Sequence, residues 1–143
     1  MNFQDCVEFA NEHRVCHIAT AEGDQPRVRA LGMWFADDRG FFFQTESVKA
    51  IYKQLQSNNK VELCFHAPGP NSGTVLRIAG KVEWVTDLAL KSRVLEERPF
   101  LEGLGVTGPE DPLLALFCVS SGEAYFWTIA QNMKEAEIER IKF

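Results

Sequence analysis

Residues 40–65, GFFFQTESVKAIYKQLQSNNKVELCF, decide the fold that this sequence predicts. The stretch has the pattern of a strand, a polar turn, an amphipathic helix and a second strand. Phenylalanines and Gln44 at 41–44 form the first strand, and the helix is expected to begin within residues 45–47. Apolar residues then recur at helical spacing and give the helix one apolar face: Val48, Ile51, Tyr52 and Leu55.

The expected first turn of this helix carries Thr45, Ser47 and Lys49. A helix N-terminus offers free backbone N–H groups and the positive end of the macrodipole, which together favour an anion. Two hydroxyls and an ammonium group at that position predict a phosphate-binding cradle. For the segment alone, a simpler interpretation is an ordinary N-cap at Thr45 or Ser47 followed by a solvated lysine.

Length and composition indicate a globular protein with a single domain over residues 1–143. Hydrophobic residues make up 45% and charged residues 24% of the chain, and the net charge of −5 comes without any run of Lys and Arg. This weighs against nucleic acid and anionic membrane surfaces as partners. The N-terminus lacks the basic start and apolar core of a signal peptide, so we expect a cytoplasmic protein without a membrane span.

The cysteines and histidines form no recognisable metal or redox motif. The four cysteines are widely spaced, and three of them lie in apolar strand-like runs, so we expect reduced thiols: Cys6, Cys16, Cys64 and Cys118. His17 and His66 are expected in strands as core or rim residues, so no metal site and no catalytic histidine is predicted.

The rest of the chain reads mainly as strands. Asn2 is expected to cap a short N-terminal helix, and Asp87 to cap a helix over 88–97. Strands are expected at 14–20, 27–36, 41–44, 61–66, 74–86, 113–119, 123–129 and, at the end, 136–143, with a turn at 120–122. Strands joined mostly by hairpins, with one helix inserted between the third and fourth, predict a mainly β protein with helices and an antiparallel barrel.

Two arginines of the second strand are candidate ligand residues. Side chains alternate along a strand, so Arg27 and Arg29 share one face and present two forked donors suited to phosphate or carboxylate. A solvated strand face near a turn is the alternative, and it fits Arg27 well. Arg29 lies deeper in the strand, where a lone cation without a partner would be costly. Gly32, expected in mid-strand, suggests a bulge or close approach by a ligand or another backbone.

These segments together resemble a known family. The segments are R-V-C-H-I-A-T, P-R-V-R-A-L, G-F-F-F-Q-T-E-S-V-K-A-I-Y-K-Q-L, V-E-L-C-F and L-R-I-A-G-K-V-E-W, followed by L-F-C-V-S-S-G-E-A-Y-F-W. In the order of these segments, the chain is similar to the pyridoxamine 5′-phosphate oxidase-like family. Those proteins are FMN-binding split barrels, Greek-key-like in topology. The similarity covers nearly the whole chain, and it implies the same fold and FMN as cofactor.

The resemblance also implies a set of cofactor contacts. The matching arginine, Arg29, would reach the FMN phosphate, with Arg27 beside it, and the main chain at Ala30 and Leu31 would face the flavin ring. The hydroxyl and lysine positions that hold the phosphate match Thr45, Ser47 and Lys49. The family forms dimers with each flavin in a cleft between two subunits, so a homodimer is expected. Trp127 is a candidate to reach across that interface.

Three functional hypotheses follow from the resemblance. True oxidases of the family bind substrate with an arginine and a histidine near the C-terminus, and no histidine follows His66 here, so we expect a small relative rather than a true pyridoxamine phosphate oxidase. The first hypothesis is an FMN-dependent oxidoreductase whose substrate is open. The alternatives are a flavin or heme carrier or sensor without turnover, and an interaction scaffold with a vestigial site.

Overall fold

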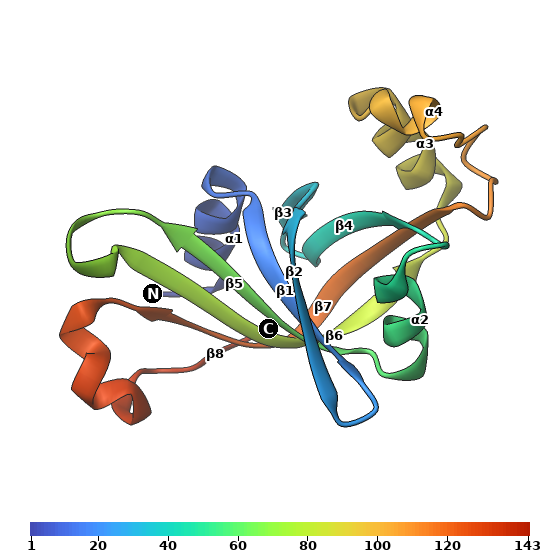
Figure 1. Cartoon of the computed structure of the whole chain (residues 1–143). Helices are drawn as coiled ribbons and strands as arrows, with labels where there is room; N and C mark the ends of the chain where they lie inside the picture. The colour runs from blue at the N-terminus through green and yellow to red at the C-terminus, as the bar shows by residue number, and fades with distance from the viewer.

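The computed structural model describes all 143 residues, and its centre is one antiparallel sheet of eight strands (Figure 1). In chain order the strands are β1 (Val15–Glu22), β2 (Gln25–Gly32), β3 (Phe35–Asp37), β4 (Gly40–Glu46), β5 (Lys60–Ala67), β6 (Thr74–Val85), β7 (Leu114–Trp127) and β8 (Ile141–Lys142). They pair in the order β2-β1-β5-β6-β7-β4-β3, and β8 adds to β7. The predicted mainly β fold with helices is confirmed, and the sheet curls into a barrel that stays split between β2 and β3.

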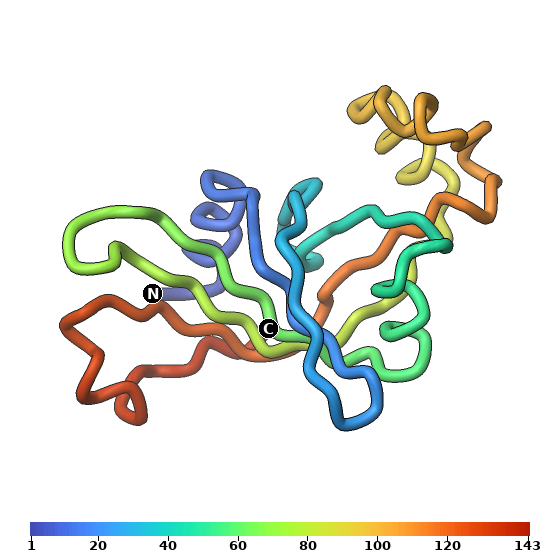
Figure 2. Tube along the Cα trace, in the orientation of Figure 1, coloured from blue at the N-terminus to red at the C-terminus, as the bar shows by residue number.

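The split lies at Met33 and Trp34, where the chain crosses from one edge of the sheet to the other (Figure 2). The Met33 N–H donates to the Arg14 carbonyl over 2.8 Å, and the Trp34 N–H donates to the Phe42 carbonyl over 2.9 Å. The Arg98 guanidinium donates to the Met33 carbonyl over 2.9 Å, and the Arg14 guanidinium donates to the Trp34 carbonyl over 2.6 Å. The single strand predicted over 27–36 is therefore wrong: it changes partner from β1 to β4 at this dipeptide, and Gly32 ends β2 instead of lying in mid-strand.

The helices cover the sheet in separate places. They are α1 (Phe3–Glu12), α2 (Ala50–Ser57), α3 (Leu88–Glu97) and α4 (Phe100–Gly103), with 3-10 turns at Pro70–Ser72 and Ile129–Glu137. Twenty buried residues inside the barrel form the main core. A second core of eight buried residues lies under α3 and α4, which stand apart from the barrel in Figure 1. None of the helices combines the length and apolar character needed to cross a membrane.

Both helix caps predicted from the sequence are present. The Asn2 side chain accepts from the Asp5 N–H over 3.1 Å, and Asp5 in turn accepts from the Asn2 N–H over 2.6 Å, which completes a capping box. The Asp87 carboxylate accepts from the Ala89 N–H over 2.8 Å, and α3 occupies the predicted residues. Local side-chain chemistry therefore determines where these two helices start.

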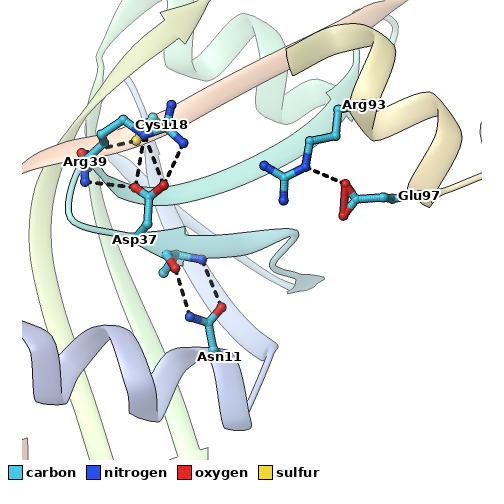
Figure 3. Close-up of polar contacts among 7 residues, drawn as sticks. Asn11, Asp37, Arg39, Arg93, Glu97 and Cys118 are labelled. Carbon is cyan, nitrogen blue, oxygen red and sulfur yellow. Dashed lines mark hydrogen bonds and ion pairs between the residues drawn. The ribbon is translucent and has the colours of Figure 1, made fainter. Parts of the chain in front are cut away.

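The short edge strand β3 is covered by a side chain instead of a strand (Figure 3). The Asn11 amide of α1 donates to the Ala36 carbonyl over 2.9 Å and accepts from the Ala36 N–H over 3.0 Å, as a neighbouring strand would. At the end of β3, the Arg39 guanidinium and Asp37 form an ion pair of 2.6 Å across the turn into β4. An edge protected in this way is a poor template for pairing with another chain.

The predicted hairpin at 120–122 is wrong, because β7 runs through these residues without a turn. The register of β6 against β7 shifts between Lys81 and Val82, which leaves Ser120 as the extra residue of a bulge. Gly80 and Gly122 face each other just beyond it, and a Cβ on Gly80 would lie 2.8 Å from the Ser121 carbonyl oxygen. Gly122, which suggested a turn, instead lies opposite Gly80 and allows two long strands to approach closely. The strand predicted over 136–143 shortens to β8, after a 3-10 segment.

All four cysteines are free thiols, and three of them are buried. Burial raises the pKa of Cys6 to about 11 and the pKa values of Cys16 and Cys118 to about 12, from an ordinary value of 9.0. The desolvated thiolate is disfavoured in each case. These thiols are therefore neutral and poorly nucleophilic at physiological pH.

We expect Arg98→Met to lower the free energy of unfolding by about 1–3 kcal/mol, because the carbonyl of Met33 and the amide oxygen of Gln44 lose their charged donor. Urea unfolding followed by circular dichroism measures this. Lys53→Met is the control, with an expected loss of about 0.5 kcal/mol or less, because it removes an exposed cation that lies away from the crossover. Equal losses in the two variants would contradict a special role for the crossover bonds.

Stability should also fall as the pH rises above about 9. Below that pH the buried thiols are neutral in the folded and the unfolded state, so their contribution to the free energy of unfolding is fully present. Above it, the thiols of the unfolded state ionise first, and this favours unfolding until the pH passes the folded-state pKa values of about 11–12. Each thiol contributes a slope of up to ~1.4 kcal/mol per pH unit. Urea unfolding from pH 8 to 10.5 should show a shallower decline for Cys16→Ala than for the wild type. Identical slopes would show that burial of this thiol is not a cause.

Candidate functional site

Arg29 lies in a polar cluster between the β1–β2 hairpin and α2. Its Nη1 donates to the Thr20 hydroxyl over 2.8 Å and to the Ile18 carbonyl over 3.3 Å, and its Nη2 donates to Gln54 Oε1 over 2.6 Å. The Thr20 hydroxyl also donates to Gln54 Oε1 over 2.6 Å. The side chains of Thr20 and Gln54 are buried, so the strand arginine is held against the helix by partners shielded from water.

The partners of Arg29 are all uncharged, although the side chain is half-buried. No carboxylate lies within ion-pair distance of it, and burial, followed by the charge of Arg27, lowers its pKa from the usual range. Arginine nevertheless keeps its charge in proteins at ordinary pH. A half-buried cation with neutral partners is a site where an external anion gains a charge-assisted interaction.

Arg27 has a different environment from Arg29. Its Nη2 forms an ion pair of 3.1 Å with Glu22 Oε1, and both side chains are about half exposed. Glu22 also accepts from Gln54 Nε2 over 3.1 Å, and this bond, with the bond and charge of Arg27, lowers the pKa of Glu22. The two arginines share a strand face as predicted, but the charge of Arg27 is already balanced by a carboxylate.

The predicted helix start is wrong, because β4 continues through Glu46 and α2 begins only at Ala50. Thr45 is fully buried in the strand, and Val48 is 80% exposed instead of lying on the apolar face. Ser47 lies in the connection, where its N–H donates to the Leu113 carbonyl over 3.0 Å. Only Lys49 is at the helix terminus, as an exposed N-cap residue without a side-chain capping bond. The hydroxyls therefore precede the helix because the Phe-rich strand stays paired with β7 as far as Glu46.

Two features at the end of β4 and the start of α2 suit a bound anion. The hydroxyl of Thr45 is buried and has no hydrogen-bond partner within the chain, and a buried polar group normally has one. Lys49 lies five residues before Gln54, which corresponds to about 7.5 Å along a helix axis. The helix that contacts Arg29 thus has the predicted lysine as its N-cap residue.

The remaining predicted contacts fall in two places. Ala30 is exposed and Leu31 is packed against the main core, both on β2, whose outer edge has no strand neighbour and so leaves main-chain groups free. Trp127 pairs with Val75 at the end of β7. Four strand-to-strand steps separate β7 from β2, or about 19 Å along the sheet. One chain does not bring Trp127 and Arg29 together.

Sequence reasoning missed Thr20 and Gln54. Gln54 is a buried polar residue between the buried residues Ile51 and Leu55 on α2. A glutamine within an apolar stripe of i, i+3, i+4 spacing was the available signal, since a buried amide needs specific partners. His17 and His66 are exposed strand residues, and the His66 ring bonds the Ser72 carbonyl over 2.8 Å.

Comparison with known proteins assigns the family. A family model described as pyridoxamine 5′-phosphate oxidase matches residues 3–128. The chain belongs to this family of FMN-binding split barrels, as a distant relative of the true oxidases. The family includes FMN-dependent oxidases.

Individual relatives differ in how far they match. A pyridoxine/pyridoxamine 5′-phosphate oxidase from Pseudomonas putida (strain W619) is 32% identical over 125 residues, covering 71% of this chain and 57% of the oxidase. The chain therefore spans little more than half the length of that enzyme. A NimC/NimA family protein from Clostridium acetobutylicum is similar over 98% of this chain and 92% of its own, with 26% identity and a TM-score of 0.77.

A third structure supports the fold alone. The pyridoxamine 5′-phosphate oxidase-related, FMN-binding protein from Nostoc punctiforme has 13% identity and a TM-score of 0.70, over 100% of this chain and 97% of its own. The fold is thus kept over the full length at very different levels of identity.

Proposed function

We propose that this protein binds FMN in a cleft between two copies of the chain and acts as a small flavin-dependent oxidoreductase. The observation that carries the proposal is the half-buried Arg29, which has neutral partners only and is held against α2 in a member of an FMN-binding family. A phosphate monoester is the group on FMN that such a cation recognises.

The chain has residues that fit each part of the cofactor. Arg29 and Lys49 would neutralise the phosphate, and the unpaired hydroxyl of Thr45, together with Ser47, would supply uncharged donors. The free edge of β2 at Ala30 and Leu31 would lie along the flavin ring. FMN, when bound, supplies the hydride or electron chemistry, and the protein supplies orientation and electrostatics.

A homodimer is part of the proposal, because Trp127 lies too far along the sheet to reach the site of its own chain. The outer face of the sheet also exposes apolar residues that a second copy would cover, including Val15 at 69% and Val28 at 68%. A symmetric dimer would bring the Trp127 of one copy toward the β2 edge of the other.

FMN affinity should depend on Arg29 and Lys49 through the phosphate. Charge-assisted contacts contribute roughly 1.5–3 kcal/mol each, so Arg29→Ala and Lys49→Ala should each weaken FMN binding by about ten- to a hundredfold. Affinity for riboflavin, which lacks the phosphate, should hardly change. Fluorescence titration of the apo-protein with both flavins measures the two affinities.

Matched controls are available beside each residue. Arg27→Ala should weaken FMN binding less than Arg29→Ala, because Arg27 is already paired with Glu22. Lys53→Ala changes one exposed lysine on the same helix and should have little effect. Equal loss of both flavins in Arg29→Ala would assign Arg29 to the ring or the fold, and a wild type that binds neither flavin would overturn the proposal.

Turnover is tested separately from binding. With FMN bound, anaerobic addition of a reduced nicotinamide should bleach the visible flavin absorbance, and air should restore it, as expected for an oxidoreductase. Free FMN at the same concentration is the control for uncatalysed reduction. A bound flavin that is reduced no faster than free FMN would favour a carrier or sensor instead.

A further inference from the structure

The side-chain amide of Gln54 lies between the Arg29 guanidinium and the Glu22 carboxylate, with its oxygen toward the cation and its NH₂ group toward the anion. Its Oε1 accepts from Arg29 over 2.6 Å and from the Thr20 hydroxyl over 2.6 Å. Its Nε2 donates to Glu22 Oε2 over 3.1 Å. The reversed amide would place its NH₂ group against the guanidinium and its oxygen against the carboxylate, so the surrounding charges fix its orientation.

This arrangement leaves part of the guanidinium free. Nη1 uses both of its N–H groups on Ile18 and Thr20, and Nη2 uses one on Gln54. A guanidinium has five N–H donors, so the N–H of Nε and one N–H of Nη2 have no partner within the chain. Two such donors are the fork with which arginine binds a phosphate or carboxylate.

We propose that Gln54 is a positioning residue that aims Arg29 at a bound phosphate while keeping its charge available. The inference rests on the proposed flavin site, and it explains why residue 54 is an amide and not a carboxylate. A carboxylate at residue 54 would form a buried ion pair with Arg29 and supply internally the negative charge that the ligand brings. The neutral amide holds the guanidinium through one donor and separates it from Glu22, the nearest acidic side chain of the cluster.

The orientation of Arg29 is fixed through buried groups, which is what a positioning role requires. Thr20 and Gln54 are each only 5% exposed, and they bond to each other as well as to Arg29. The guanidinium therefore keeps its direction without an ion pair. A preorganised donor loses less conformational freedom on binding than a mobile surface arginine does.

The test is Gln54→Glu, read as the ratio of riboflavin to FMN dissociation constants in fluorescence titrations at pH 7.5. This ratio should fall about ten- to a hundredfold, toward that of Arg29→Ala, because the phosphate then competes with a carboxylate for the same cation. Gln56→Glu, an exposed position on the same helix, introduces the same charge and should leave the ratio within about twofold of wild type. Gln54→Glu combined with Glu22→Gln removes the new repulsion between carboxylates, so it should recover thermal stability but not the ratio.

A second measurement uses inorganic phosphate, so that failure of this inference is distinguishable from failure of the flavin proposal. Millimolar phosphate at constant ionic strength should raise the melting temperature of wild type and of Gln56→Glu, but not of Gln54→Glu. If wild type binds no flavin yet shows this phosphate effect, the flavin proposal fails and the role of Gln54 stands. The inference is overturned if Gln54→Glu leaves both the flavin ratio and the phosphate effect unchanged. It is also overturned if Gln56→Glu lowers the ratio and the phosphate effect as much as Gln54→Glu does, or if wild type responds to neither flavin nor phosphate.

Discussion

The barrel depends on satisfying four main-chain polar groups at one buried dipeptide. Met33 and Trp34 are 0% and 2% exposed, yet they belong to no strand, since they carry the chain between the two edges of the sheet. An unpaired amide or carbonyl there would cost on the order of 1–3 kcal/mol. Arg14 and Phe42 provide backbone partners from either side of the split, and the guanidinium groups of Arg14 and Arg98 bind the two carbonyls. Two arginines thereby replace the missing strand neighbours.

The candidate site is a consequence of the same crossover. Arg29 lies three residues before the end of β2 and is paired opposite Ile18, on one side of the split. Thr45, Lys49 and Gln54 come from β4 and α2, which the chain reaches only after crossing. The candidate site thus combines side chains from both halves of the sheet, and Gln54 of α2 is the residue that bonds to Arg29 across the split.

Much of the fold could be predicted from local patterns in the sequence. Asp87 capped the helix as expected and Pro99 follows its end, so α3 has the predicted bounds. The interpretation of Arg29 as a deep, forked donor agrees with its half-buried position. These features depend on capping chemistry and strand alternation, which are visible in a few neighbouring residues.

The errors arose where a distant partner overrides the local pattern. Thr45 was expected in a helix, but pairing with Ala115 of β7 keeps it in a strand. Gly122 suggested a turn, but Gly80, far away in the sequence, lies opposite it and makes it part of a tight strand pair. The importance of Gln54 depends on contacts with Thr20 and Glu22, which are more than thirty residues away. No periodicity within α2 specifies such partners.

The strand order has a further consequence for how the chain is made. The first six strands to be synthesised fall into two groups, β2-β1-β5-β6 and β4-β3, and only β7 pairs with both. At 5–20 residues per second, the roughly seventy residues between β4 and β7 take several seconds to leave the ribosome. β4 presents an unpaired edge during that interval, and β6 presents another from its own completion at Val85 until β7 follows; both are open to the same edges of neighbouring nascent chains. A chaperone that shields these two edges until β7 emerges would serve this topology more than one that shields the finished barrel.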